Sequence, residues 1–223
     1  WGEFNDPESD IVGYRYALGT EPKEDDIIPW TEIDNYTITN ITEYNVYEHH
    51  RLEGSLVSTM LFAGQTYYFS VEATNGAGHT CMNSSNGILY DPTPPNMLYV
   101  NDGLIPGEDI DSTSIVDLLT GNWEAEDKET GIYDYEICMG DMYAYSLVDE
   151  DASMCNLNEP LSTLNSNIFG RYDLPLQSGV TYYIWVRAMN NAGATTFGGV
   201  DYMWSDWMPS DGITIGRSTM TIG

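Results

Sequence analysis

Basic residues are scarce in this chain of 223 residues. Lysine and arginine together number 7, against 35 aspartates and glutamates, and the formal net charge is −28. A phosphate backbone and an anionic membrane surface would both repel such a chain. We therefore expect no binding to nucleic acid. The surface is expected to be acidic and well solvated, with counter-ions, Ca²⁺ among them, close to it.

Long hydrophobic runs are also missing. No apolar stretch approaches the roughly 20 residues that span a bilayer, so we expect no membrane insertion within this sequence. The sequence shows no signal peptide, and its first residue is Trp1 rather than methionine. We expect the chain to be a processed product or a fragment of a longer protein.

Cysteine occurs at three positions, Cys81, Cys138 and Cys155. There is no Cys-x-x-Cys pair and no cysteine–histidine spacing typical of zinc. Cys138 and Cys155 lie in the same half of the chain, which favours a disulfide between them. A link from Cys81 to either of the other two is an open alternative. Otherwise Cys81 is unpaired or bridged to another chain.

Motifs for catalysis are missing too. The sequence has no nucleophile elbow, phosphate-binding loop, zinc-protease motif or dinucleotide-binding turn, and we predict that the protein is not an enzyme. Its carboxylates are so numerous that close pairs are expected by chance. One cluster, formed by Glu108, Asp109 and Asp111, is nevertheless a candidate Ca²⁺ site, although it lacks the ligand spacing of an EF-hand loop.

Apolar and aromatic side chains, in contrast, are abundant. Hydrophobic residues make up 42% of the chain and aromatic residues 13%, with 17 tyrosines and 6 tryptophans. This share is sufficient for packed cores. Aromatic side chains also favour β-structure, because their rings pack well on a pleated surface.

An internal repeat runs through the sequence. Residues 64–78 return as residues 179–193, with an offset of 115 residues. Two further matches, one beginning at Asp6 and Asp127 and the other at Ser85 and Ser210, have offsets of 121 and 125 residues. The changing offset indicates two copies of one domain with loops of different length.

The proline-rich stretch 91–95 separates the two copies, and we expect it to be a short stiff linker. Domain one is therefore assigned to residues 1–91 and domain two to residues 92–216. Residues 217–223 form a tail. Apolar residues alternate with other types over residues 67–73 and 182–188, which predicts a half-buried strand in each domain.

The repeated pattern is a leucine and a glycine followed by Tyr-x-x-x-Val-x-Ala-x-Asn-x-x-Gly, and it resembles strand F of fibronectin type III domains with the corner that leads into it. The resemblance implies an all-β fold of two tandem β-sandwiches. It also implies that the Tyr67 and Tyr182 hydroxyls bond back to the upstream backbone as tyrosine corners. Trp1 and Trp123 resemble the core tryptophan that ends strand B.

The two domains are expected to differ in completeness. In domain two, strand A is predicted at residues 97–100 and strand B leads into Trp123. Nothing in domain one corresponds to residues 96–122, so we expect it to lack strand A and most of strand B. Such a sandwich exposes a core groove and unpaired strand edges.

The tail is a candidate donor strand for that groove. Met220 and Ile222 alternate with polar residues, and Ile222 follows Ile213 by nine residues, the spacing that separates Met97 from Ile88. Strand donation from one copy to the next would give a head-to-tail filament. The alternative is that the chain is an excerpt of a longer array, whose missing strands lie upstream.

Three glycosylation sequons begin at Asn35, Asn40 and Asn83. Together with the scarcity of lysine they indicate the secretory route, N-linked glycans and an extracellular or cell-surface location. The predicted function is a non-catalytic extracellular structural protein that self-associates head to tail.

An adhesive or receptor-like ectodomain that binds another extracellular protein or a glycan through its loops is the alternative function. A third hypothesis is an accessory region of a carbohydrate-active enzyme. Trp204 and Trp207, which lie between strands F and G, suit such binding if they are exposed. Otherwise they fold back onto their own domain.

Overall fold

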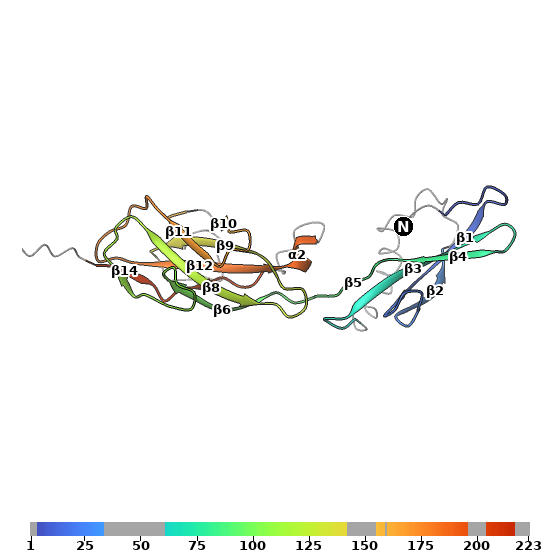
Figure 1. The fold of residues 1–223 in the computed structure, drawn as a ribbon, viewed down its shortest axis with the longest axis horizontal. Coiled ribbons are helices and arrows are strands. Elements are labelled where there is room, and N and C mark those ends of the chain that lie inside the picture. Colours follow the sequence, from blue (N-terminus) through green and yellow to red (C-terminus); the bar gives the residue numbers. More distant parts are fainter. Residues whose placement is uncertain (1–3, 34–60, 142–154, 159, 196–203, 217–223) are drawn as a thin grey trace, which may run out of the picture. The chain divides into compact units, whose positions relative to one another are not determined.

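The computed structural model describes residues 4–33, 61–141, 155–158, 160–195 and 204–216. The chain forms two compact units, residues 1–91 (unit 1) and residues 92–223 (unit 2). Both consist of β-strands, and the described residues include one short helix, α2 (Asn191–Thr195) (Figure 1). None of the described helical residues form a segment with the length and apolar character needed to cross a membrane.

Unit 2 is a sandwich of two β-sheets, as predicted. The first sheet has the order β11 (Ile168–Arg171), β8 (Leu119–Glu126), β6 (Asn96–Asp102). The second has the order β10 (Leu161–Ser162), β9 (Ile132–Gly140), β12 (Thr181–Asn190), β14 (Ile213–Ile215), β7 (Ser112–Thr113), and β13 (Met208–Pro209) also pairs with β12. All pairs are antiparallel except β14 with β7.

The core of unit 2 lies between these sheets. Trp123 on β8 is fully buried, and its ring meets that of Tyr135 on β9 edge to face, with 5.9 Å between the ring centroids. The alternating residues of β12 that predicted a half-buried strand, among them Ile184 and Val186, are buried in the same cluster. Each such large apolar side chain contributes roughly 1.5–3 kcal/mol of transfer free energy to folding.

Unit 1 shows one sheet among its described residues. Its order is β2 (Ile28–Glu32), β1 (Ile11–Gly19), β3 (Thr66–Asn75), β4 (Thr80–Ser84), and β5 (Ile88–Leu89) pairs with the start of β3. This order matches that of β10, β9, β12 and the β13–β14 region in unit 2. Residues 4–33 and 61–91 contain no second sheet.

The repeated sequence motifs have the same structural role in both units. The Asp6 carboxylate accepts a hydrogen bond of 2.6 Å from the Asn75 side chain, and the Asp127 carboxylate accepts one of 3.3 Å from Asn190. Each aspartate also accepts backbone N–H groups of the turn that follows it. The motif therefore ties the turn before β1 or β9 to the end of β3 or β12.

Tyrosine corners are present in both units. The Tyr67 hydroxyl accepts a hydrogen bond of 2.7 Å from the backbone N–H of Phe62. The Tyr182 hydroxyl accepts one of 2.9 Å from the backbone N–H of Gln177. Both rings are buried, so the bond satisfies a hydroxyl that would otherwise lose its partners on folding.

Candidate functional site

An arginine–glutamate pair lies at the same register position in both units, with the two residue types exchanged. In unit 1, Arg15 on β1 faces Glu72 on β3, with 2.6 Å between Nε and Oε1. In unit 2, Glu136 on β9 faces Arg187 on β12, with 2.6 Å between Nη2 and Oε2. The outer face of each sheet therefore carries one paired guanidinium at its centre.

Each of these guanidinium groups also lies over tryptophan. The Arg15 guanidinium is 4.9 Å from the centroid of the Trp30 ring. The Arg187 guanidinium is 4.6 Å from the Trp204 ring and 4.8 Å from the Trp207 ring. Cation–π contacts of this kind contribute about 0.5–1 kcal/mol when exposed and more when shielded from water. Trp204 and Trp207 therefore fold onto their own domain, one of the two alternatives that the sequence left open.

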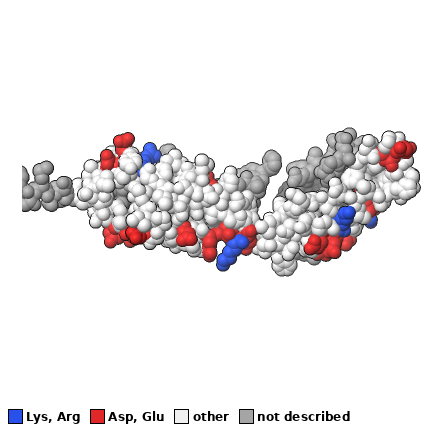
Figure 2. Space-filling model, viewed as in Figure 1, with Lys and Arg blue, Asp and Glu red and all other residues white. Residues whose placement is uncertain are grey.

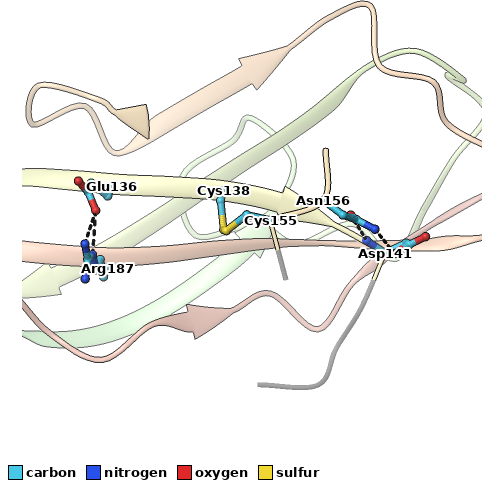
Figure 3. The surroundings of a disulfide bond; sticks show 6 residues. All are labelled: Glu136, Cys138, Asp141, Cys155, Asn156 and Arg187. Atoms are coloured by element: carbon cyan, nitrogen blue, oxygen red, sulfur yellow. Dashed lines mark hydrogen bonds and ion pairs between the residues drawn. A yellow bond between two sulfur atoms is a disulfide. The ribbon is translucent and has the colours of Figure 1, made fainter. Parts of the chain in front are cut away.

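A second, smaller cluster of buried residues lies beside this stack. It consists of Cys138, Cys155 and Trp185, with Trp207 and Tyr183 packed against it. Cys138 and Cys155 form the disulfide that the sequence favoured (Figure 3). Cys81 is a free, exposed thiol on β4 of unit 1. The outer face of the second sheet of unit 2 is thus partly covered rather than fully solvated.

Hydrogen bonds hold the chain segment 204–210 along β12. The Ser205 hydroxyl accepts the N–H of Ala188 at 2.9 Å, and the Ser210 hydroxyl accepts the N–H of Ile184 at 3.1 Å. The backbone N–H of each serine donates in return to the carbonyl of the same β12 residue. Two buried serines therefore fix both ends of a segment that carries two tryptophans.

A groove of about 410 Å³ lies between this segment and the start of β6. One wall is formed by Pro94, Pro95, Asn96 and Met97, and the other by residues 204–209. Trp204 and Trp207 are each half-buried, and both line the groove. Asp206 is exposed and is the one charged residue among those that line the groove.

An aspartate cluster lies elsewhere in unit 2, where β6 ends. Carboxylate oxygens of Asp102, Asp109 and Asp211 lie within 4.8 Å of one another, a spacing that one cation is able to bridge. Asp102 is fully buried and accepts hydrogen bonds of 3.2 Å from the Ser210 hydroxyl and from the Gly212 N–H. The other two aspartates are exposed.

Burial and the neighbouring charges change the acidity of this cluster. The pKa of Asp102 is raised to about 7, chiefly by loss of solvation. The Ser210 hydrogen bond acts to lower it, and the charges of Asp109 and Asp211 act to raise it. The pKa of Asp211 is also raised, by partial desolvation and then by Asp109. A proton or a cation relieves the repulsion between these groups.

The predicted calcium ligands are only partly brought together. Asp109 belongs to the cluster, and Asp111 acts on Asp211 through its charge. Glu108 is not a member; its backbone carbonyl accepts a hydrogen bond from Asn122. The sequence reasoning missed Asp102 and Asp211 because they are distant in sequence from residues 108–111. Calcium binding therefore stays a prediction.

Other predicted residues are placed as follows. Asn83, the acceptor of the third sequon, is exposed on β4. Trp1, Asn35, Asn40, Met220 and Ile222 lie outside the described residues. N-linked glycosylation and strand donation therefore stay predictions.

Searches of protein-family models and of curated proteins find no match. Among solved structures, the chain is similar to domains A168–A170 of titin, with 13% identity, a TM-score of 0.44 and coverage of 94% of this chain. It spans 56% of the titin chain. It is also similar to the fibronectin(III)-like modules of Clostridium thermocellum CbhA, with 11% identity, a TM-score of 0.35 and coverage of 99% of this chain and 86% of that one. The two antiparallel sheets and the tyrosine corner of unit 2 are those of a fibronectin type III-like fold.

Proposed function

We propose that the protein is a non-catalytic structural module of an extracellular repeat protein, in which added β-strands complete unit 1. The observation that carries this proposal is the difference between the two cores. In unit 2, both sheets contribute buried residues, including Val100, Leu119 and Trp123 from the first sheet. In the described part of unit 1, the buried cluster is Tyr14, Val71 and Ala73, all from one sheet.

The apolar face of unit 1 requires a second layer for the same physical reason as that of unit 2. Because β1 and β3 have the register of β9 and β12, their inward side chains correspond to residues that pack on β6 and β8 in unit 2. A single sheet alone would leave such a face in water, which is unfavourable, yet Tyr14, Val71 and Ala73 are already buried within this chain. Strands from outside residues 4–33 and 61–91 are therefore expected to cover it.

Our specific proposal is that residues 217–223 of a neighbouring copy supply one of these strands. Met97, the residue that follows Ile88 by nine positions, lies on β6, the first strand of unit 2. Ile222 likewise follows Ile213 on β14 by nine positions in the sequence. This spacing supports a role for the tail as a first strand, and repeated donation would build a head-to-tail filament.

The test is assembly of the full chain and of two tail variants. We expect concentration-dependent oligomers in sedimentation and filaments in negative-stain images. Met220→Asp with Ile222→Asp should abolish them, since both changes place charge on the apolar side of the tail. The matched control, Thr219→Asp with Thr221→Asp, adds the same charge on the polar side and should assemble. A full chain that stays monomeric, or equal assembly of both variants, contradicts strand donation.

The alternative within the same function is a longer array in which upstream strands of the same polypeptide complete unit 1. It predicts a monomer in sedimentation and a unit 1 that gains stability only when upstream sequence is added. Extracellular location, N-linked glycans and head-to-tail self-association belong to this proposal as well. The exposed position of Asn83 and the scarcity of basic residues support it.

A further inference from the structure

The groove of unit 2 between Pro94–Met97 and Trp204–Pro209 combines three properties that together define a ligand chemistry. Its volume of about 410 Å³ lies within the range of about 300–1,000 Å³ that binding pockets occupy. Its walls are mostly proline, methionine and tryptophan. Its rim carries one charge, and that charge is negative.

The wall that carries the tryptophans is preformed. Trp204 forms an isolated β-bridge with Met189, and Met208 and Pro209 pair with Val186 and Trp185 of β12. A ligand therefore meets ordered indole rings without an entropic cost for ordering them.

Prolines interrupt the strand edges on both walls, since β13 and the start of β6 are edge strands of their sheets. Pro209 has no N–H group, and Pro94 and Pro95 lack one as well. Addition of a peptide as a further β-strand would leave ladder bonds unmade at these positions. A polyproline II segment, which docks through its side chains and rings on an aromatic-lined surface, has no such requirement.

The tryptophans of this wall already bind one guanidinium group. The Arg187 guanidinium lies over both rings, and its charge is neutralised by Glu136. Because Glu136 neutralises Arg187, this arginine does not cancel the negative charge of the surrounding surface. Its contacts also show that these rings accept a planar cation. A second cation at the groove would meet the remaining ring surface and the Asp206 carboxylate.

The net charge of this chain indicates whether a second copy or a different protein supplies that cation. A second copy would bring a charge of −28 with only 7 basic side chains, which disfavours self-association at an acidic groove. Acidic side chains also outnumber basic ones on the face seen in Figure 2. We propose that this groove binds an extended, proline-containing basic segment of a different protein. The site is independent of strand donation, which involves unit 1 and the tail.

The probe is a synthetic dodecapeptide of repeated Pro-Pro-Arg, titrated into the ¹⁵N-labelled full chain. We expect saturable shifts of the Trp204 and Trp207 indole N–H signals. Repeated Gly-Gly-Arg, with the same charge and no proline, should bind at least about fivefold more weakly, because it must also lose the backbone freedom that proline has already restricted. Repeated Pro-Pro-Glu should not bind.

Matched variants locate the site. Asp206→Asn should weaken binding about threefold, as expected for one rim charge of less than 1 kcal/mol, whereas Asp117→Asn removes the same charge elsewhere on unit 2 and should have no effect. Trp207→Phe should weaken binding, and Trp30→Phe, which changes the tryptophan beside Arg15 in unit 1, should not.

Several outcomes overturn the proposal. Equal binding of the proline and glycine peptides, or equal effects of Asp206→Asn and Asp117→Asn, would indicate diffuse attraction to an acidic surface. Shifts of the two indole signals on dilution without peptide would indicate a second copy as the occupant. A response to oligomannose but not to peptide would indicate a glycan. Assembly is measured separately by sedimentation, so failure here leaves strand donation untouched.

Discussion

Asp102 is a fully buried carboxylate with a strongly raised pKa. It is fully buried between β6 and the Ser210–Gly212 turn, and its pKa of about 7 lies well above the 3.9 of an unfolded aspartate. Since the folded state holds the proton more tightly, this group stabilises the fold fully below pH 4. Its contribution is lost as pH rises to 7.

We predict that Asp102→Asn removes this pH dependence. With cations chelated, urea unfolding of the wild type should show a falling stability of unit 2 between pH 4 and pH 8. The variant should lose less unfolding free energy than the wild type over this range. The difference between them at pH 8 should be at most about 4 kcal/mol, which corresponds to a pKa difference of roughly three units. Asp211→Asn, at an exposed member of the cluster, is the control and should keep most of the slope. Parallel pH profiles for wild type and Asp102→Asn would contradict the assignment.

Gly212 is a second residue with a specific physical role. Its φ of 101° is in the left-handed region, and an added Cβ would collide with the Tyr183 ring and with Thr181. We predict that Gly212→Ala lowers the unfolding free energy of unit 2 by about 2 kcal/mol or more. Gly107→Ala, at a φ of 78° with open space around the added Cβ, should cost only about 1 kcal/mol. Thermal unfolding that ranks the two variants equally would rule out the collision.

At the scale of elements, the segment 204–210 is held on β12 by Arg187 as well as by the two serines. Exchange of the pair, Glu136→Arg with Arg187→Glu, keeps one ion pair across β9 and β12 but moves the guanidinium away from the two tryptophans. We predict a loss of about 1–2 kcal/mol in unit 2, because both cation–π contacts are lost. Arg187→Lys, which keeps the charge at the original position, is the control and should lose less. Full stability of the exchanged pair in urea unfolding would show that only the ion pair matters.

The central strand of each unit could be predicted from the sequence because its alternation is local. The period-two pattern in β3 and β12 and the tyrosine corners depend on residues close together in the sequence. The Asp6–Asn75 and Asp127–Asn190 pairs, in contrast, join residues 69 and 63 positions apart and were not predicted. The site could not be predicted in the same way. Asp102 and Asp211, like Glu136 and Arg187, are far apart in sequence, and only the antiparallel pairing of distant strands brings them together.

One signal for the site was nevertheless present in the repeat. The offsets of 121 and 115 residues align Arg15 with Glu136 and Glu72 with Arg187. An exchange of opposite charges at two aligned positions indicates that the two positions face each other. Trp204 and Trp207 gave no such signal, because their segment has no counterpart of equal length in the first copy.

At the scale of the whole molecule, the net charge of −28 is the dominant source of long-range electrostatic repulsion. Repulsion between carboxylates destabilises the folded state, and salt screens it over a length that falls from about 30 Å at 0.01 M to about 3 Å at 1 M. We predict that the melting temperature rises by several degrees as NaCl increases from 0.01 M to 1 M. Sorbitol at equal osmolality is the control for solvent exclusion. A melting temperature that responds equally to sorbitol, or falls with salt, would exclude screening as the cause.

Two similar repeats in one polypeptide can exchange strands with each other during folding, which is a known route to misfolded tandem domains. Pairing of β1 with β12 in the native register would place Arg15 opposite Arg187, and pairing of β3 with β9 would place Glu72 opposite Glu136. Both encounters bring like charges together, whereas each correct pairing brings opposite ones together. The reversed order of arginine and glutamate in the two units therefore favours folding of each repeat with its own strands.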